Sequence, residues 1–190
     1  MLRYTQMIFA LVACLPSFAS AAAITFNYTA TLSGGPGILT GSFGYDDAVP
    51  DDLPGAPNEG RYPGAGFWTG VVTGGPQDGV SFSVSGAQTR IFDNFSTIGD
   101  MLEMTAAPTT FINMEDAQAT TFTSDSLPST LTLADFEIRN MFLSAADVGG
   151  PAGPQVQYIL QSISPVPAPA AVWLFGSALG ILGWTRRMQR

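Results

Sequence analysis

Residues 24–32 read ITFNYTATL, with an apolar side chain at every second position and threonine or asparagine between them. Because successive side chains of a β-strand point to opposite faces of a sheet, this period of two predicts a strand with one buried face. The next five residues, SGGPG at 33–37, are typical of a tight turn. A strand followed at once by a chain reversal indicates a β fold.

The same alternation returns further along the chain. Residues 80–85 (VSFSVS) and 156–160 (VQYIL) repeat it. In 131–138 the apolar positions change face, which a β-bulge near Ala134 or Asp135 explains. Weaker strands are predicted at 38–45, 66–73, 89–95, 101–105, 109–114 and 119–123.

Roughly eight to ten short strands, separated by Gly, Pro, Asn and Asp, predict an all-β domain built as an antiparallel β-sandwich or jelly roll. We place this secreted domain at 24–161, with a loop at 145–154 before its last strand. A proline-rich stalk is predicted at 162–169. No convincing helix or internal repeat precedes the stalk.

The composition of residues 24–165 excludes several functions. They contain three arginines and all fifteen acidic residues of the chain, which gives a net charge of −12. Such a surface repels nucleic acid and anionic lipid, so nucleic-acid binding is excluded. The chain has no His and no Lys, which removes Ser-His-Asp triads, imidazole bases, His-ligated metals and Schiff-base chemistry. Carboxylate chemistry remains, but no motif selects a pair, and we expect no enzymatic activity.

The N-terminus has the features of a secretory signal peptide at 1–23. Arg3 precedes an apolar stretch, and Ala21, Ala22 and Ala23 offer sites for signal peptidase. Cys14, in the sequence LVAC, also fits a bacterial lipobox, although the apolar stretch continues beyond it. If this cysteine leaves with the signal peptide, the mature chain has neither a disulfide nor a thiolate.

The C-terminus predicts a transmembrane helix at about 170–185. No residue from Ala170 to Trp184 is charged, and this stretch spans roughly 22 Å as a helix, short of the ~30 Å hydrocarbon core. The arginines that follow place the C-terminus in the cytoplasm and the domain outside. The alternatives are a buried helix of a soluble domain and a plain tail anchor.

The tail resembles the PEP-CTERM sorting signal, in its Val-Pro-x-Pro-Ala form, over 166–190. The residues that match are Val166, Pro167, Pro169 and Ala170 of the motif and Arg186 and Arg187 of the terminal cluster. Ala168 departs from the residue common at that position, which leaves the variant of the sorting enzyme open. The resemblance implies processing by an exosortase, display at the cell surface and a structural or interaction role in an exopolysaccharide or biofilm matrix.

The segment 41–46, GSFGYD, resembles a strand found early in many exported domains of that family. In physical terms, Phe43 and Tyr45 face one side and Asp46 caps the following turn.

Two groups of residues are candidate sites in the domain. The carboxylates of Asp46, Asp47, Asp51 and Asp52 lie within seven residues and suit calcium, although the EF-hand spacing is absent and the pattern favours a solvated, self-repelling loop. The aromatic residues Tyr62, Phe67 and Trp68 follow or flank glycines and suit a sugar platform, unless they belong to the core. Together they define a rival prediction, a calcium- or carbohydrate-binding jelly-roll module.

Overall fold

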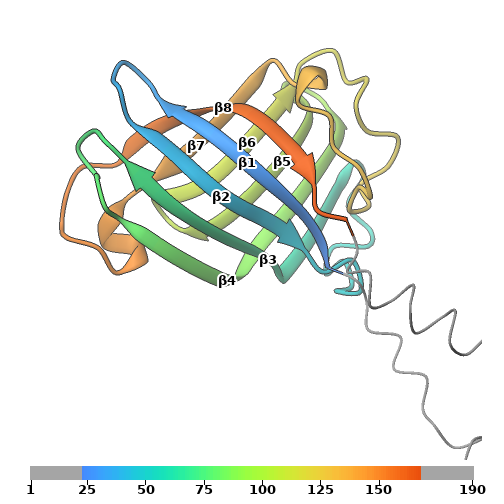
Figure 1. Cartoon of the computed structure of the whole chain (residues 1–190). Helices are drawn as coiled ribbons and strands as arrows, with labels where there is room; N and C mark the ends of the chain where they lie inside the picture. The colour runs from blue at the N-terminus through green and yellow to red at the C-terminus, as the bar shows by residue number, and fades with distance from the viewer. Residues whose placement is uncertain (1–22, 168–190) are drawn as a thin grey trace, which may run out of the picture.

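The computed structural model describes residues 23–167. They form antiparallel strands that close into a barrel in the order of the chain, so that each strand pairs with the next and β8 pairs with β1 (Figure 1). The strands are β1 (Ile24–Leu32), β2 (Ile38–Tyr45), β3 (Glu59–Thr73), β4 (Ser81–Phe95), β5 (Gly99–Ala107), β6 (Thr110–Asp116), β7 (Ile138–Leu143) and β8 (Val156–Pro165). Two short 3-10 helices, η1 (Leu133–Asp135) and η2 (Ala145–Val148), lie before and after β7.

The all-β class is confirmed, but the predicted sandwich is wrong because the strands form one closed sheet. A buried and a solvated face alternate along a strand in a sandwich and in a barrel alike, so periodicity does not separate the two. One long-range strand pairing distinguishes the barrel from a sandwich. β1 pairs with β8 from Phe26 opposite Pro165 to Leu32 opposite Tyr158, which closes the sheet on itself.

The structure differs from the strand prediction in several segments, and β3 begins at Glu59 instead of the predicted residue 66. The strands predicted at 80–85 and 89–95 are one strand, β4, which continues past Gly86. Residues 119–123 and 131–137 lie in the β6–β7 connection, where η1 stands in place of the predicted bulge. Their apolar side chains cover one end of the barrel, so their spacing does not follow a sheet. β8 continues to Pro165, so residues 162–165 of the predicted stalk belong to the barrel.

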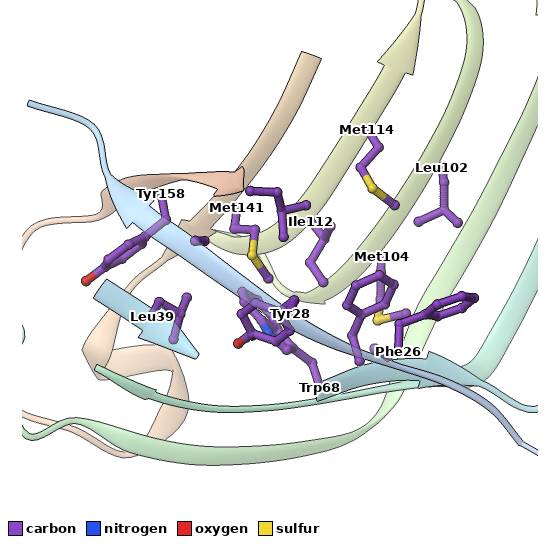
Figure 2. Close-up of a cluster of buried hydrophobic side chains, with 14 of the residues drawn as sticks. Phe26, Tyr28, Leu39, Trp68, Leu102, Met104, Ile112, Met114, Met141 and Tyr158 are labelled. Carbon is purple, nitrogen blue, oxygen red and sulfur yellow. Dashed lines mark hydrogen bonds between the residues drawn. The ribbon is translucent and has the colours of Figure 1, made fainter. Parts of the chain in front are cut away.

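The interior of the barrel is occupied by large apolar side chains. Phe26 stacks on Phe43 with 5.5 Å between ring centroids, and Trp68 meets Phe82 edge-on at 5.1 Å. Figure 2 shows side chains that point into this interior, among them Phe26, Trp68 and Tyr158. The interior of an eight-stranded barrel is only wide enough for such side chains to fill, and this core holds the strands in register.

Two buried aromatic residues, Tyr28 and Trp68, are joined in the core by a hydrogen bond to the Tyr28 hydroxyl. The Tyr28 hydroxyl donates to the Thr69 carbonyl (3.0 Å) and accepts a hydrogen bond from Trp68 Nε1 (2.8 Å). Burial raises the pKa of Tyr28 above its ordinary value, so the phenol stays neutral. Gly70, on β3, leaves room for it, because a Cβ at this position would lie 2.7 Å from the Tyr28 oxygen.

The β6–β7 connection, residues 117–137, covers the end of the barrel where β1 begins and β8 ends. We call this the terminal end. The hydroxyls of Tyr45 and Tyr62 donate to the carbonyls of Pro128 and Asp125 in the connection (2.5 and 2.9 Å). The connection also buries Phe122, Leu131, Leu133 and Phe136. It is therefore attached to the barrel wall by both apolar and polar contacts.

Candidate functional site

The four carboxylates predicted to bind calcium lie in the β2–β3 connection at the terminal end. Asp46 Oδ1 accepts a hydrogen bond from the Ala48 amide (3.0 Å), which confirms its predicted role as a turn cap. Asp51 Oδ1 accepts from the amides of Leu53 (2.9 Å) and Arg61 (2.8 Å). These carboxylates hold the local chain in place rather than converging on one point.

An ion pair between Asp52 and Arg61 also holds this loop. Both oxygens of Asp52 accept hydrogen bonds from the Arg61 guanidinium, at 2.6 Å from Nε and 3.1 Å from the terminal nitrogen. Within residues 23–167, no group of three or more acidic side chains is arranged to hold a metal ion. The structure thus brings Asp46, Asp47, Asp51 and Asp52 into one loop but not into one coordination sphere.

Calcium is therefore expected to leave the stability of the protein unchanged. Binding to the folded state alone would raise the melting temperature, and a site at ten times its Kd contributes about 1.4 kcal/mol. Thermal unfolding with millimolar calcium and with EGTA measures the difference, which we expect to be within about 1 °C. A rise of several degrees in calcium would contradict this expectation and restore the calcium site.

The three aromatic residues predicted as a sugar platform are divided between the two faces of β3. Tyr62 and Trp68 are buried, with 7% and 0% of their surfaces exposed. Phe67 is half-buried on the opposite side of the strand, where its ring leaves no room for a Cβ at Gly44. Trp68 therefore belongs to the core, and the three rings do not share one exposed surface.

Acidic residues gather at the terminal end because β2, β4 and β6 finish there while β3, β5 and β7 begin there. The group is Asp46, Asp47, Asp51, Asp52, Asp93, Asp100, Asp116, Asp125, Asp135 and Glu137. The sequence shows the acidic residues but not their common position, since they come from three separate stretches of the chain, 46–52, 93–100 and 116–137.

Two of these acidic residues are buried and organise the β6–β7 connection. Asp100 Oδ2 accepts a hydrogen bond from the Phe122 amide (2.6 Å). Asp116 accepts from the Thr120 amide and hydroxyl (2.8 and 2.9 Å), from the Thr121 hydroxyl (3.0 Å) and from the Gln118 amide (2.9 Å). Burial opposes ionisation of Asp116, but these bonds together hold its pKa below the usual range. Sequence reasoning missed both, although threonines four and five residues after an aspartate are a usable signal.

Acid is expected to weaken the protein through Asp116. The pKa of Asp116 is lower in the folded state than in the unfolded state. Its contribution to the free energy of unfolding is therefore complete above the unfolded pKa of about 3.9, and it is lost as the pH falls through the folded pKa. Calorimetry between about pH 3 and pH 7 should show a lower melting temperature for Asp116→Asn at neutral pH and a smaller loss on acidification. The exposed Asp47→Asn variant should follow the wild type. Equal acid sensitivity of Asp116→Asn and wild type would contradict this role.

An open cavity of about 340 Å³ lies between β7 and β8, lined by residues 137–140 and 159–161. The two strands pair only from Leu143 opposite Val156 to Asn140 opposite Ile159, and beyond that point β8 pairs with β1 alone. We call this opening in the barrel wall the fork. No local pattern predicts it, because it results from the point at which one ladder ends.

Arg139 lines the fork and differs from the other two arginines of the barrel. Arg61 pairs with Asp52, and Arg90 pairs with Glu59 (2.7 Å) and Glu103 (3.5 Å). In the described part of the chain, no carboxylate lies within ion-pair distance of Arg139. The fork thus contains Arg139 without an ion pair, and Glu137 lines the same cavity.

The predicted sorting signal begins at the edge of the described structure. The Val166 amide donates to the Thr25 carbonyl (2.8 Å), and both Val166 and Pro167 are exposed. Pro169, Ala170, Arg186 and Arg187 lie outside the described residues, as do the predicted transmembrane helix and most of the signal peptide. Between residues 23 and 167, no helix has the length and apolar character needed to cross a membrane.

The sites found here therefore consist of a loop of locally bonded carboxylates, a buried aromatic pair, a pair of buried aspartates and the fork with Arg139. Comparison with known proteins adds no further assignment to them. The chain matches no protein-family model, no curated protein and no solved structure.

Proposed function

We propose that this chain is an exported protein, sorted to the cell surface through its C-terminal signal by an exosortase, whose barrel has a structural or interaction role in the extracellular matrix. One observation carries the proposal. β1 begins at Ile24, directly after the predicted signal peptide, and β8 ends at Pro165, directly before Val166. The folded unit fits between the two predicted targeting segments.

The position of Val166 supports processing at the tail. Its amide extends the β1–β8 ladder by one bond, and the exposed Pro167 follows. Every strand residue precedes the motif, so cleavage beyond Val166 would remove the tail without removing any part of a strand. A protein processed in this way keeps its closed barrel.

The negative charge of the terminal end supports a position of the barrel away from the lipid surface. Both Ile24 and Pro165 lie there, so a tail inserted in the membrane would turn this end toward the bilayer. The carboxylates gathered at this end repel anionic headgroups. The barrel would then stand off the membrane and present its remaining surface to the matrix.

The side chains of the barrel support an interaction role over catalysis. Its interior is occupied by apolar residues, and its buried carboxylates, Asp100 and Asp116, already bind the chain's own amides and hydroxyls. The outer faces of β1 and β4 carry mainly threonine, asparagine and serine. A partner that approaches β1 or β4 would therefore meet a polar surface.

Intact-mass measurement of the protein released from the cell surface tests the proposal. We expect a product that lacks residues 1–23 and is truncated at or after the motif beginning at Val166. A Pro167→Ala, Pro169→Ala double variant should retain the whole tail. A Pro151→Ala, Pro154→Ala variant, altered in an exposed loop, should be processed normally. A released wild-type product that still ends at Arg190 would sink the sorting proposal and leave a plain tail anchor.

A further inference from the structure

We propose that the fork and the neighbouring outer face of β8, β1 and β2 bind an uncharged polysaccharide, with one sugar unit seated in the fork. This inference names the partner class for the proposed interaction role and rests on that role. It does not depend on how the tail is processed.

The fork is a cavity that combines polar and apolar groups. Its volume of about 340 Å³ lies at the lower end of the range for small-ligand pockets, about 300–1,000 Å³. Leu160 lines the cavity but is only 1% exposed, so the cavity ends against this side chain. Ile138 and Ile159 add apolar surface, and Asn140 and Gln161 add amide groups. A ligand with both C–H and hydroxyl groups matches this lining.

Two opposite charges line the fork without meeting each other. Glu137 and Arg139 are two residues apart, yet within residues 23–167 neither takes part in an ion pair. The Glu137 carboxylate accepts one hydrogen bond, a long one from the Ala117 amide (3.4 Å). A ligand with a net charge would be attracted by one of the two groups and repelled by the other. Hydroxyl groups suit both, because a hydroxyl donates and accepts.

Gln161 connects the fork with the outer face of the barrel. Its amide nitrogen donates to the Thr31 hydroxyl (3.0 Å) and to the Ile159 carbonyl (3.1 Å). These bonds use the N–H groups of the side chain and fix it at the junction of β8 and β1. The carbonyl oxygen of the side chain is then the group that can accept a hydrogen bond from a ligand.

The outer face beside the fork carries short polar side chains in register. β8, β1 and β2 lie side by side (Figure 1), and two rows of exposed or half-buried residues cross them. The rows are Ser162, Thr29 and Thr40, and Ser164, Asn27 and Ser42. Neighbouring strands lie about 5 Å apart and the two rows about 7 Å apart. The face therefore presents a grid of hydroxyl and amide groups to a long, hydroxyl-rich partner.

The distribution of charge selects a partner without charge. No residue of β8, β1 or β2 is charged, although residues 24–165 have a net charge of −12. A cationic polymer would be drawn to the carboxylates of the terminal end, and an anionic polymer would be repelled by the domain as a whole. A second copy of this chain is repelled for the same reason. A neutral polysaccharide fits both the uncharged face and the balanced charges of the fork.

NMR titration of the full chain with sugars of different charge tests the site. The chain is kept in dodecylphosphocholine micelles, whose headgroup contains no sugar. The neutral probes are cellohexaose, maltohexaose and a dextran oligomer, and the anionic probe is hexagalacturonic acid. We expect at least one neutral probe to shift the amides of Arg139, Asn140 and Gln161 with a Kd of about 1 mM or lower. The anionic probe should bind at least about tenfold more weakly.

Two results of this titration would overturn the proposal. One is the absence of shifts at these amides with every neutral probe at about 20 mM. The other is binding of the anionic probe as tight as that of the neutral probes, because it would show that charge does not select the partner.

Variants separate the fork and the outer face from the rest of the barrel. Arg139→Met removes the hydrogen-bond donors but keeps a long side chain, and it should weaken binding of the neutral probe about tenfold. A Ser162→Val, Ser164→Val double variant should weaken it by a similar factor. The matched control is Ser81→Val, Ser83→Val, which alters exposed serines of β4 and should leave the Kd within about twofold. Thermal unfolding checks that each variant is folded.

Wild-type affinity in Arg139→Met, or an equal loss in the β4 control, would overturn the assignment of the site. Neither result bears on the intact mass of the surface product, so failure of this inference and failure of the sorting proposal are distinguishable.

Discussion

Replacing Gly41 with alanine is expected to destabilise the protein more than any other substitution considered for the barrel wall. A Cβ at this position would lie 2.0 Å from the Thr69 carbonyl oxygen and 2.8 Å from the Gly70 Cα, both of which are backbone atoms. Backbone cannot move aside without breaking the β2–β3 ladder, so we expect a loss above about 3 kcal/mol. Domains of this kind have a net stability of about 5–15 kcal/mol, so the loss is a large part of it.

Urea unfolding followed by far-ultraviolet circular dichroism measures this effect. Gly55→Ala is the matched control, because nothing lies within 4 Å of a Cβ there and its backbone has no left-handed angle. It should change the stability by less than about 0.5 kcal/mol. Similar stabilities for the two variants would show that β2 and β3 do not approach as closely as their pairing requires.

The second large effect is expected from Trp68→Ala. Trp68 is fully buried, meets Phe82 edge-on and donates a hydrogen bond to Tyr28. Removing a buried tryptophan side chain costs about 3–5 kcal/mol, since it leaves a cavity as well as losing contacts. The same urea titration measures it. Circular dichroism is preferred to fluorescence because Trp173 and Trp184 remain in the tail.

Phe67→Ala is the control for Trp68→Ala, because it removes the adjacent aromatic ring from the opposite face of β3. Its ring is half-buried, so the expected loss is clearly smaller. If Trp68 served a ligand instead of the core, its removal would cost no more than that of Phe67. That outcome would contradict its place in the barrel interior.

Several elements could be predicted because their signal is local. The bounds of β1 and β2 agree with the predicted 24–32 and 38–45, since a period of two flanked by Gly, Pro and Asp turns defines a strand without reference to the rest of the chain. The turn cap of Asp46 was predicted for the same reason. The sequence left two interpretations of Trp68, a core residue or part of a sugar platform. Only its 0% exposure decides for the core.

Other features could not be predicted because they depend on distant partners. Phe122 and Phe136 suggested strands, yet they lie in the connection that covers the terminal end. Asp100 and Asp116 were not distinguished from the surface carboxylates, because their role depends on the amides and hydroxyls that the connection brings to them. Arg139 carries no local signal at all. It lines the fork only because the ladder between β7 and β8 ends one residue away, at Asn140.

The sequence by itself determined that residues 24–165 form an acidic β-domain without His or Lys, and that predicted targeting segments stand on both sides of it. Only the tertiary structure decided that the strands close into a barrel. Alternation records which face of a strand is buried, and it is the same for every way of packing that face. Closure depends on β1 meeting β8, more than 120 residues apart, and the fork exists only because that pairing continues after the β7 ladder has ended.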